Sequence, residues 1–85
     1  MNEESMPMSE PQLLERITSR QDVFAGKPIV RGMRISVELI LSLLAQGESP
    51  SDILADYPDL EAEDIQACIA YAGAGREERQ RHARF

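Results

Sequence analysis

Apolar residues at intervals of three and four positions predict a helix from about Ser36 to Gln46. Ser36 is a favoured N-cap residue, and Gly47 is a favoured residue directly after a helix. One apolar stripe of this helix comprises Val37, Ile40, Leu41 and Leu44. A second stripe, formed by Leu39 and Leu43, lies on another side and either packs within the domain or covers a partner. We take Leu39 and Leu43 as the candidate self-association surface.

Two further helical segments follow at short intervals. Ser49 and Pro50 supply a cap and a first-turn proline for a short helix that Pro58 ends. A longer helix begins after Leu60, and its predicted buried stripe is Ile65, Cys68, Ile69 and Ala72. The order of helix, turn, short helix, turn and longer helix is that of a helix-turn-helix unit.

A short β-ribbon is expected before the helices. Residues 14–19 alternate apolar and polar side chains, which favours a strand, and the expected partner strand is residues 33–36. Between them, Gly26-Lys27-Pro28 predicts a shaped loop, and Arg31-Gly32 predicts a tight turn. Phe24 is expected to pack from this loop onto the helices.

The chain has room for one domain. Residues 1–13 carry prolines, serines and glutamates without an apolar face, so we expect a disordered N-terminal tail. Residues 14–75 form the single domain, and residues 76–85 form a basic tail or a helix extension. About 60 residues bury little apolar surface, and the chain has no tryptophan and no cysteine pair, so a homodimer is a reasonable expectation.

Charge is segregated along the chain, whose net charge is −6. Residues 16–34 hold five basic side chains against one acid, residues 35–75 hold eight acids and no Lys or Arg, and residues 76–84 hold four arginines. Such segregation can steer a charged partner, although solvated acidic faces are common. A single cysteine and the absence of a long apolar run favour a cytoplasmic protein that does not span a membrane.

The run from Ile17 to Ala72 resembles a small bacterial family first catalogued as a domain of unknown function. The matching elements, in family order, are Ile17-Thr18, Gly26-Lys27-Pro28, Arg31-Gly32, Arg34-Ile35, the Leu-rich helix, Gly47, Asp52-Ile53-Leu54, Asp56-Tyr57-Pro58-Asp59-Leu60, Asp64-Ile65 and Ala70-Tyr71-Ala72. This family is regarded as antitoxin-like and is often encoded beside a PIN-like ribonuclease toxin. The resemblance implies a mainly α, homeodomain-like helix-turn-helix fold with a short N-terminal β-ribbon. It also implies no catalysis, and binding of a toxin and of operator DNA. The chain departs from the family pattern at several positions, including Glu61, where the family usually has a Ser or Thr cap.

The charge pattern bears on the choice of partner. The N-terminal turns of the last helix would read bases in ordinary helix-turn-helix docking, but they carry Glu61, Glu63 and Asp64, which oppose a phosphate backbone. Gln66 is the candidate base contact there. Arginine presents a fixed fork of donors that suits carboxylates such as those that hold metal in PIN-like nucleases. The candidate partner-binding residues, for a toxin or for nucleic acid, are Lys27, Arg31, Arg34, Arg76, Arg79, Arg81, Arg84 and Phe85.

Catalytic chemistry has little support in the sequence. The one histidine, His82, lies in the polar C-terminal tail, and Cys68 falls on an apolar stripe where a small buried hydrophobe is the common role. No calcium-loop or phosphate-loop motif is complete. We therefore expect no enzyme, no metal and no cofactor. The expected function is that of an antitoxin that binds and neutralises a PIN-like ribonuclease toxin, and autoregulation through operator DNA is left open. The alternatives are a stand-alone DNA-binding transcriptional regulator and a self-associating structural module.

Overall fold

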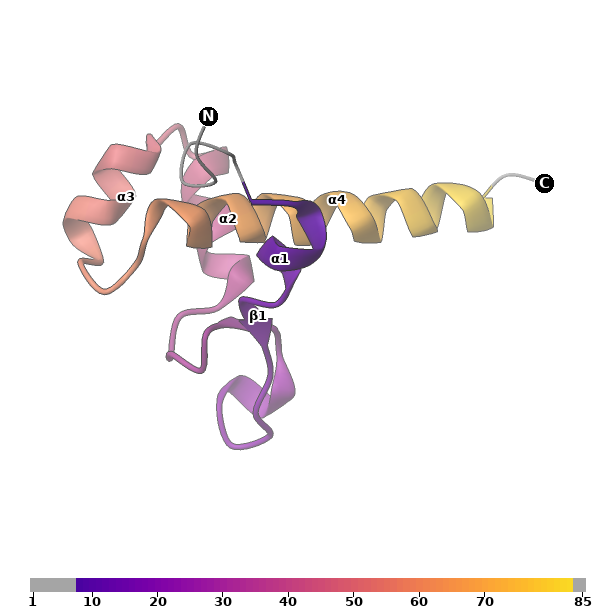
Figure 1. The fold of residues 1–85 in the computed structure, drawn as a ribbon, viewed down its shortest axis with the longest axis horizontal. Helices are drawn as coiled ribbons and strands as arrows, with labels where there is room; N and C mark the ends of the chain where they lie inside the picture. The colour runs from indigo at the N-terminus through magenta and orange to yellow at the C-terminus, as the bar shows by residue number, and fades with distance from the viewer. Residues whose placement is uncertain (1–7, 84–85) are drawn as a thin grey trace, which may run out of the picture.

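In the computed structural model, three helices pack on a short antiparallel ribbon, and a further helix precedes the ribbon (Figure 1). The structure describes the backbone of residues 8–83 and the side chains of residues 8–74. In chain order the elements are α1 (Glu10–Leu14), β1 (Ile17–Thr18), the 3-10 turn η2 (Phe24–Gly26), β2 (Ile29–Val30), α2 (Val37–Ala45), α3 (Pro50–Asp56) and α4 (Ala62–Ala83). The succession α2, α3 and α4 with short turns is the predicted helix-turn-helix arrangement, so the expected fold class is confirmed.

Local capping explains where α2 and α3 begin and end. The Ser36 hydroxyl accepts a hydrogen bond from the backbone N–H of Leu39 at 3.0 Å, which satisfies one free donor of the first turn of α2. Ser49 and Asp52 form a capping box at the start of α3, with N···O distances of 3.1 and 3.3 Å. Gly47 follows α2 with a φ of +97°, a conformation that favours glycine. The predicted limits of both helices are therefore confirmed.

The ribbon pairs differently from the prediction. β1 pairs with β2, with Ile17 opposite Val30 and Thr18 opposite Ile29, and not with residues 33–36. The turn at Arg31 and Gly32 has positive φ at both residues and is closed by a hydrogen bond from Met33 N–H to the Val30 carbonyl at 2.7 Å. This tight turn returns residues 33–36 along the other edge of β2, where the N–H of Val30 donates to the Ile35 carbonyl. β2 is therefore the central segment, and both of its side chains are buried.

The loop before β2 places a different side chain inward than predicted. Val23 is buried, whereas Phe24, expected to pack on the helices, is 45% exposed. Phe24 and Ala25 both have positive φ, and the backbone turns at these two residues within η2. Because the chain turns there, the preceding residue takes the inward position. The prediction for Phe24 was wrong.

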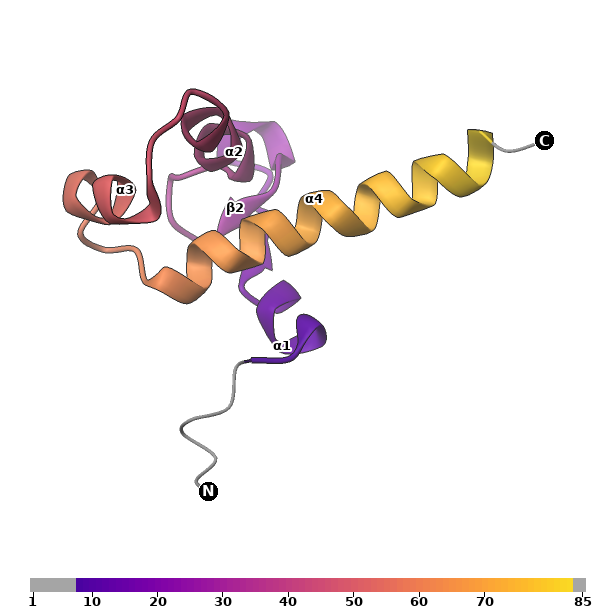
Figure 2. The ribbon, with the colours of Figure 1, turned by 90° about the horizontal axis from the view of Figure 1, so that it is seen from above.

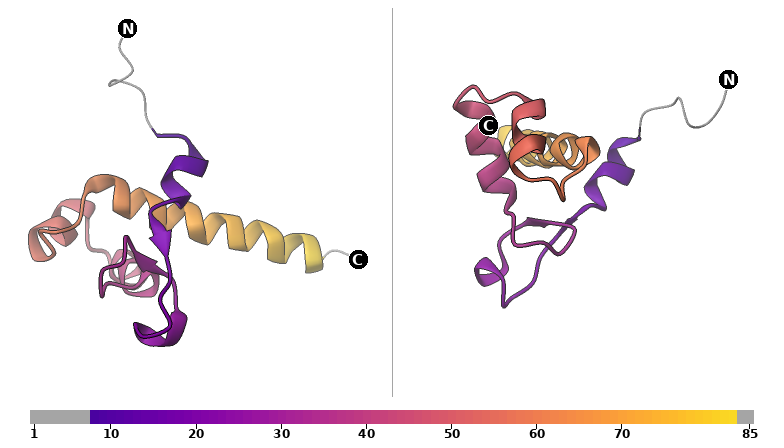
Figure 3. Two further views of the ribbon diagram at one scale, coloured as in Figure 1. Left: turned by 60° about the horizontal axis from the view of Figure 1, so that its bottom comes forward. Right: turned by 90° about the vertical axis from the view of Figure 1, so that its left-hand side faces the viewer.

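The core lies between α2, α3, α4 and the ribbon. Ile40 and Ile53 are fully buried at its centre, and Leu41, Leu43 and Leu44 pack partly buried against it. On α4, Ile65 and Cys68 are buried as predicted, but Ile69 is 52% exposed and Ala67 is fully buried. α4 packs against α2 and α3 and, on another side, against α1 (Figure 3). Its buried surface therefore differs from the single stripe that the sequence predicts.

Helix α1 corrects the expectation of a disordered tail over residues 1–13. Ser9 and Gln12 form a capping box at its start, and Pro11 lies in its first turn. The helix packs against α4, with Leu13 and Leu14 half-buried. Residues 1–7 lie outside the described part of the chain, so the prediction for them stays a prediction.

α4 is much longer than its contact with the rest of the domain requires. It comprises 22 residues, and its C-terminal half extends away from the other elements (Figures 1 and 2). The backbone of residues 76–83 continues this helix, which agrees with the helix-extension alternative for the basic C-terminal segment. The side chains of residues 75–85 lie outside the described part of the chain.

Two glycine substitutions should have opposite effects on stability. Gly47→Ala places a Cβ where φ is +97°, so we expect the free energy of unfolding to fall by about 1 kcal/mol. Gly73 lies inside α4 with open space around an added Cβ, so Gly73→Ala should raise it by up to about 1 kcal/mol. Urea unfolding followed by circular dichroism measures both values. A loss of stability in Gly73→Ala would contradict the helical conformation at that position.

Candidate protein-interaction site

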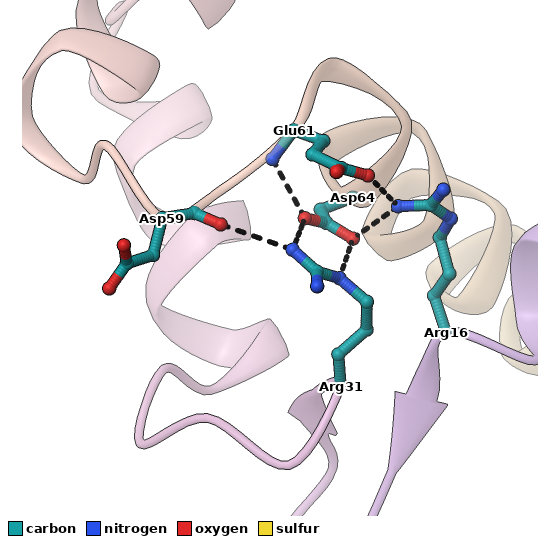
Figure 4. A network of polar contacts seen from close by, with 5 residues as sticks. All are labelled: Arg16, Arg31, Asp59, Glu61 and Asp64. Carbon is teal, nitrogen blue, oxygen red and sulfur yellow. Dashed lines mark hydrogen bonds and ion pairs between the residues drawn. The ribbon is translucent and has the colours of Figure 1, made fainter.

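A buried carboxylate joins the ribbon to the start of α4. Asp64 is 1% exposed, and its oxygens accept hydrogen bonds from Arg16, from Arg31 and from the backbone N–H of Glu61 (Figure 4). Arg31 binds in a bidentate manner, with Nε 2.9 Å from Oδ1 and Nη2 2.8 Å from Oδ2. Arg16 Nη1 donates to Asp64 Oδ1 and to Glu61 Oε1, each at 2.8 Å. We call these four residues the Asp64 network.

Local structure positions each member of the Asp64 network. Asp64 lies in the first turn of α4, where its carboxylate reaches back to the N–H of Glu61, as the third helical residue of a capping box does. Arg31 occupies a corner of the turn after β2, and its N–H donates to the Arg16 carbonyl at 2.8 Å, which brings the two arginines together. Arg31 Nη2 also donates to the carbonyl of Asp59, 3.1 Å away, in the turn between α3 and α4.

The electrostatics of the Asp64 network follow from burial and pairing. Burial by itself raises the pKa of Asp64, but hydrogen bonds from Arg31, the Glu61 N–H and Arg16 outweigh that effect, so the pKa lies below its ordinary value. Hydrogen bonds to Glu61 and Asp64 raise the pKa of Arg16, and the hydrogen bond to Asp64 raises that of Arg31. Two guanidinium groups and two carboxylates thus form a neutral set.

Arg31 is one of the predicted partner-binding residues, but the Asp64 network gives its side chain a structural role. Arg31 directs its guanidinium at Asp64 and Asp59, so its donors serve contacts within the chain. The sequence pattern predicts no contact for Arg16, and it places Asp64 only among the acids that oppose a phosphate backbone. The available signal was the pairing of a basic segment, residues 16–34, with an acidic one, residues 59–64, but charge pattern alone does not say which residues meet.

The other predicted site residues lie apart from one another. The Lys27 Nζ is 3.3 Å from Glu38 Oε1 in an exposed ion pair, Arg34 is exposed at the ribbon, and Gln66 is exposed on α4. Leu39 and Leu43 are both half-buried, and Leu43 packs against the core. The side chains of Arg76, Arg79, Arg81, Arg84 and Phe85 lie outside the described part of the chain.

One thiol and one pocket stand out among the described residues. Burial raises the pKa of Cys68 to about 12, with a further contribution from the charge of Asp64, so its thiol is a poor nucleophile. A pocket of about 330 Å³ between the ribbon and α4 is lined by Ile17, Thr18, Ser19, Gly26, Pro28 and Tyr71. Within residues 8–74, no group of three or more His, Cys, Asp or Glu side chains is placed to hold a metal ion. None of the helices in the described range has the length and apolar content needed to cross a membrane.

Replacing Asp64 by Asn should destabilise the fold strongly. The variant removes the carboxylate that pairs with Arg31 and one of the two carboxylates that pair with Arg16, while its own buried side chain loses the charge that these arginines match. We therefore expect the free energy of unfolding to fall by about 3 kcal/mol. Glu61→Gln is the matched control, because Glu61 is exposed and its ion pair should contribute less than about 1 kcal/mol. Urea unfolding of both variants measures the difference, and equal losses would contradict a special role for Asp64.

The contribution of Asp64 should disappear in acid. Because the pKa of Asp64 is lower in the folded than in the unfolded state, its contribution is fully present above the unfolded value of about 3.9. It is lost as the pH falls through the lower, folded value. The stability difference between the wild type and Asp64→Asn should therefore be constant near neutral pH and shrink below about pH 4. A difference that stayed constant down to pH 2 would contradict this assignment.

Comparisons with known proteins agree with the fold and identify a family. The family described as "Protein of unknown function (DUF433)" matches residues 17–72. An uncharacterised protein of Sinorhizobium fredii (strain NBRC 101917 / NGR234), y4eO, is 38% identical over 60 residues, which are 71% of this chain and 27% of that protein. The chain thus spans about a quarter of the length of this relative.

A solved structure extends the agreement to almost the whole chain. The crystal structure of a DUF433 member protein from Anabaena variabilis ATCC 29413 superposes with a TM-score of 0.68 at 26% sequence identity. The superposition covers 96% of this chain and 97% of that one. From the match over residues 17–72, this chain is a member of the DUF433 family of proteins of unknown function.

Proposed function

We propose that this protein is a non-enzymatic, antitoxin-like binding module that neutralises a PIN-like ribonuclease toxin. The observation that carries the proposal is the C-terminal half of α4, a helix that extends away from the domain and leads into the arginine-rich end of the chain. The resemblance to an antitoxin-like family supplies the class of partner. The proposal includes a homodimer as the working form and the cytoplasm as its location.

The chemistry of the arginines suits such a partner. Nucleases of the PIN-like class, as the resemblance implies, hold metal in a cluster of carboxylates. A guanidinium group binds carboxylates through two parallel hydrogen bonds and can block the approach of metal or RNA. The candidate residues at the end of α4 and beyond it are Arg76, Arg79, Arg81 and Arg84, with Phe85 as an apolar anchor.

The ribbon supplies a second, smaller group of contacts. Arg34 is exposed, and Lys27 is engaged only in an exposed ion pair with Glu38 that a stronger partner can replace. Arg31 is not part of this group, because its guanidinium is bound to Asp64. We therefore propose Lys27 and Arg34 as auxiliary toxin contacts.

Operator binding is the second candidate function, and the Asp64 network favours it. Asp64 and Glu61 are both paired with arginines, so the start of α4 repels phosphate less than the sequence alone suggests. Gln66 is exposed two residues after Asp64 and remains the proposed base contact. A salt titration of binding to the upstream DNA separates this function from toxin binding, since DNA affinity should fall steeply as salt rises.

Removal of the basic end should abolish neutralisation. The full chain, co-expressed with the product of the adjacent gene, should form a complex that relieves toxicity in a growth assay. Truncation after Gly75 removes the arginines and should abolish both effects. Deletion of residues 1–7 is the control, because it removes a terminal segment that contains none of the arginines. Protection by the truncated form equal to that of the full chain would contradict the proposed role of the basic end.

A further inference from the structure

The pocket between the ribbon and α4 has no role in the function proposed above. β1 crosses α4 (Figure 3), and the pocket lies between the two, with residues 17–19, Gly26 and Pro28 on the ribbon side and Tyr71 on the helix side. Its volume of about 330 Å³ is within the range of ligand sites in proteins. Thr18, Ser19 and Tyr71 are exposed, so the pocket is accessible from the surface.

The strand that lines this pocket has an unpaired edge. Among the described residues β1 pairs only with β2, whose other edge is occupied by residues 33–36. The N–H of Val30 donates to Ile35, away from β1, so Ile17 and Val30 form a non-hydrogen-bonded pair. The N–H and carbonyl of Ile17 therefore point to the outer edge of β1. By strand alternation those of Ser19 do so too, and Ser19 makes no backbone–backbone hydrogen bond with another described residue.

These backbone groups define the class of ligand. An extended peptide beside the outer edge of β1 would pair with the donors and acceptors of Ile17 and Ser19. Every second side chain of that peptide would lie on the same face of the sheet as the side chains of Ile17 and Ser19, both of which line the pocket. Pro28 and Tyr71 add apolar walls. The pocket therefore suits one apolar side chain of an added strand.

Arg20 and Lys27 favour an acidic peptide over a basic one. Each of the two is a direct sequence neighbour of a residue that lines the pocket. Their ion pairs, with Asp22 at 2.9 Å and with Glu38 at 3.3 Å, join side chains that are all more than half exposed. Such pairs contribute little to stability, so carboxylates of an incoming peptide can replace them.

We propose that the outer edge of β1 and the pocket beside it bind an extended segment of a partner protein in which acidic and apolar residues alternate. The segment adds a strand to the ribbon and places an apolar side chain between Ile17, Pro28 and Tyr71. This site is distinct from the arginine-rich end of the chain, and it shares only Lys27 with the toxin contacts proposed above. It does not depend on the partner being a toxin.

A peptide titration tests the site on the full chain. The probe is a capped peptide of about seven residues in which glutamate alternates with leucine, and calorimetry measures its affinity. Ser19→Pro removes an outward N–H at a position where an edge strand tolerates proline. Tyr71→Ala removes a wall of the pocket. Ile69→Ala is the matched control, because Ile69 is a large exposed residue of the same helix that does not line the pocket.

Two altered peptides make the test independent of whether a protein variant folds. One has N-methyl groups on the leucine amides, which removes the strand hydrogen bonds, and the other has lysine in place of glutamate. Circular dichroism checks that each protein variant keeps its helices.

The wild type and Ile69→Ala should bind the probe equally, and more weakly as salt rises. Ser19→Pro and Tyr71→Ala should each weaken binding by about tenfold or more, because each removes a contact of the added strand. Neither altered peptide should bind measurably.

Several results would overturn the proposal. They are a wild type that does not bind the probe, binding by Ser19→Pro equal to that of the wild type, and undiminished binding of the N-methylated peptide. Self-association of the free chain that Ser19→Pro abolishes would also overturn it, since the edge would then belong to a second copy. The growth assay with truncation after Gly75 concerns a different surface, so each proposal can fail without the other.

Discussion

The contact of Asp64 with two arginines is the interaction on which the arrangement of this domain depends. Arg31 and Arg16 lie 33 and 48 residues before Asp64 in the sequence, and both belong to the small ribbon region. A two-stranded ribbon with two residues per strand has little stability of its own. A buried carboxylate, in turn, requires partners for its charge. The ribbon and the start of α4 therefore stabilise each other, and the orientation of α4 depends on the turn after β2.

The contact of Asp64 with the two arginines also bears on whether this helix-turn-helix domain binds DNA through α4. In DNA-binding members of this architecture, the first turns of the third helix face bases. Here Glu61 and Asp64, at the start of α4, are bound to the chain's own Arg16 and Arg31. The architecture alone therefore does not assign a DNA-binding role, and function has to be argued from the surface that remains available.

The sequence predicts correctly those features that depend on residues close together in the chain, such as the limits of the helices. Ser36, Gly47 and Ser49 act within three or four residues of the chain, and the helix limits they predict are those observed. It was less informative where structure is decided by tertiary contacts. In the sequence, Asp64 cannot be told from any other acid in the first turn of a helix, because its partner Arg31 is distant along the chain. Whether Val23 or Phe24 is buried depends on the backbone conformation inside η2. Side-chain spacing also could not reveal that α1 covers one side of α4.

Helix α1 has a consequence for where this domain begins. The family match covers residues 17–72, so it starts after α1 and directly after Arg16. A fragment cut at those limits would leave Asp64 with one guanidinium partner and would uncover the side of α4 that α1 packs against. The structural unit that these contacts define is therefore longer than the segment that matches the family, and it includes α1 with its capping residue Ser9.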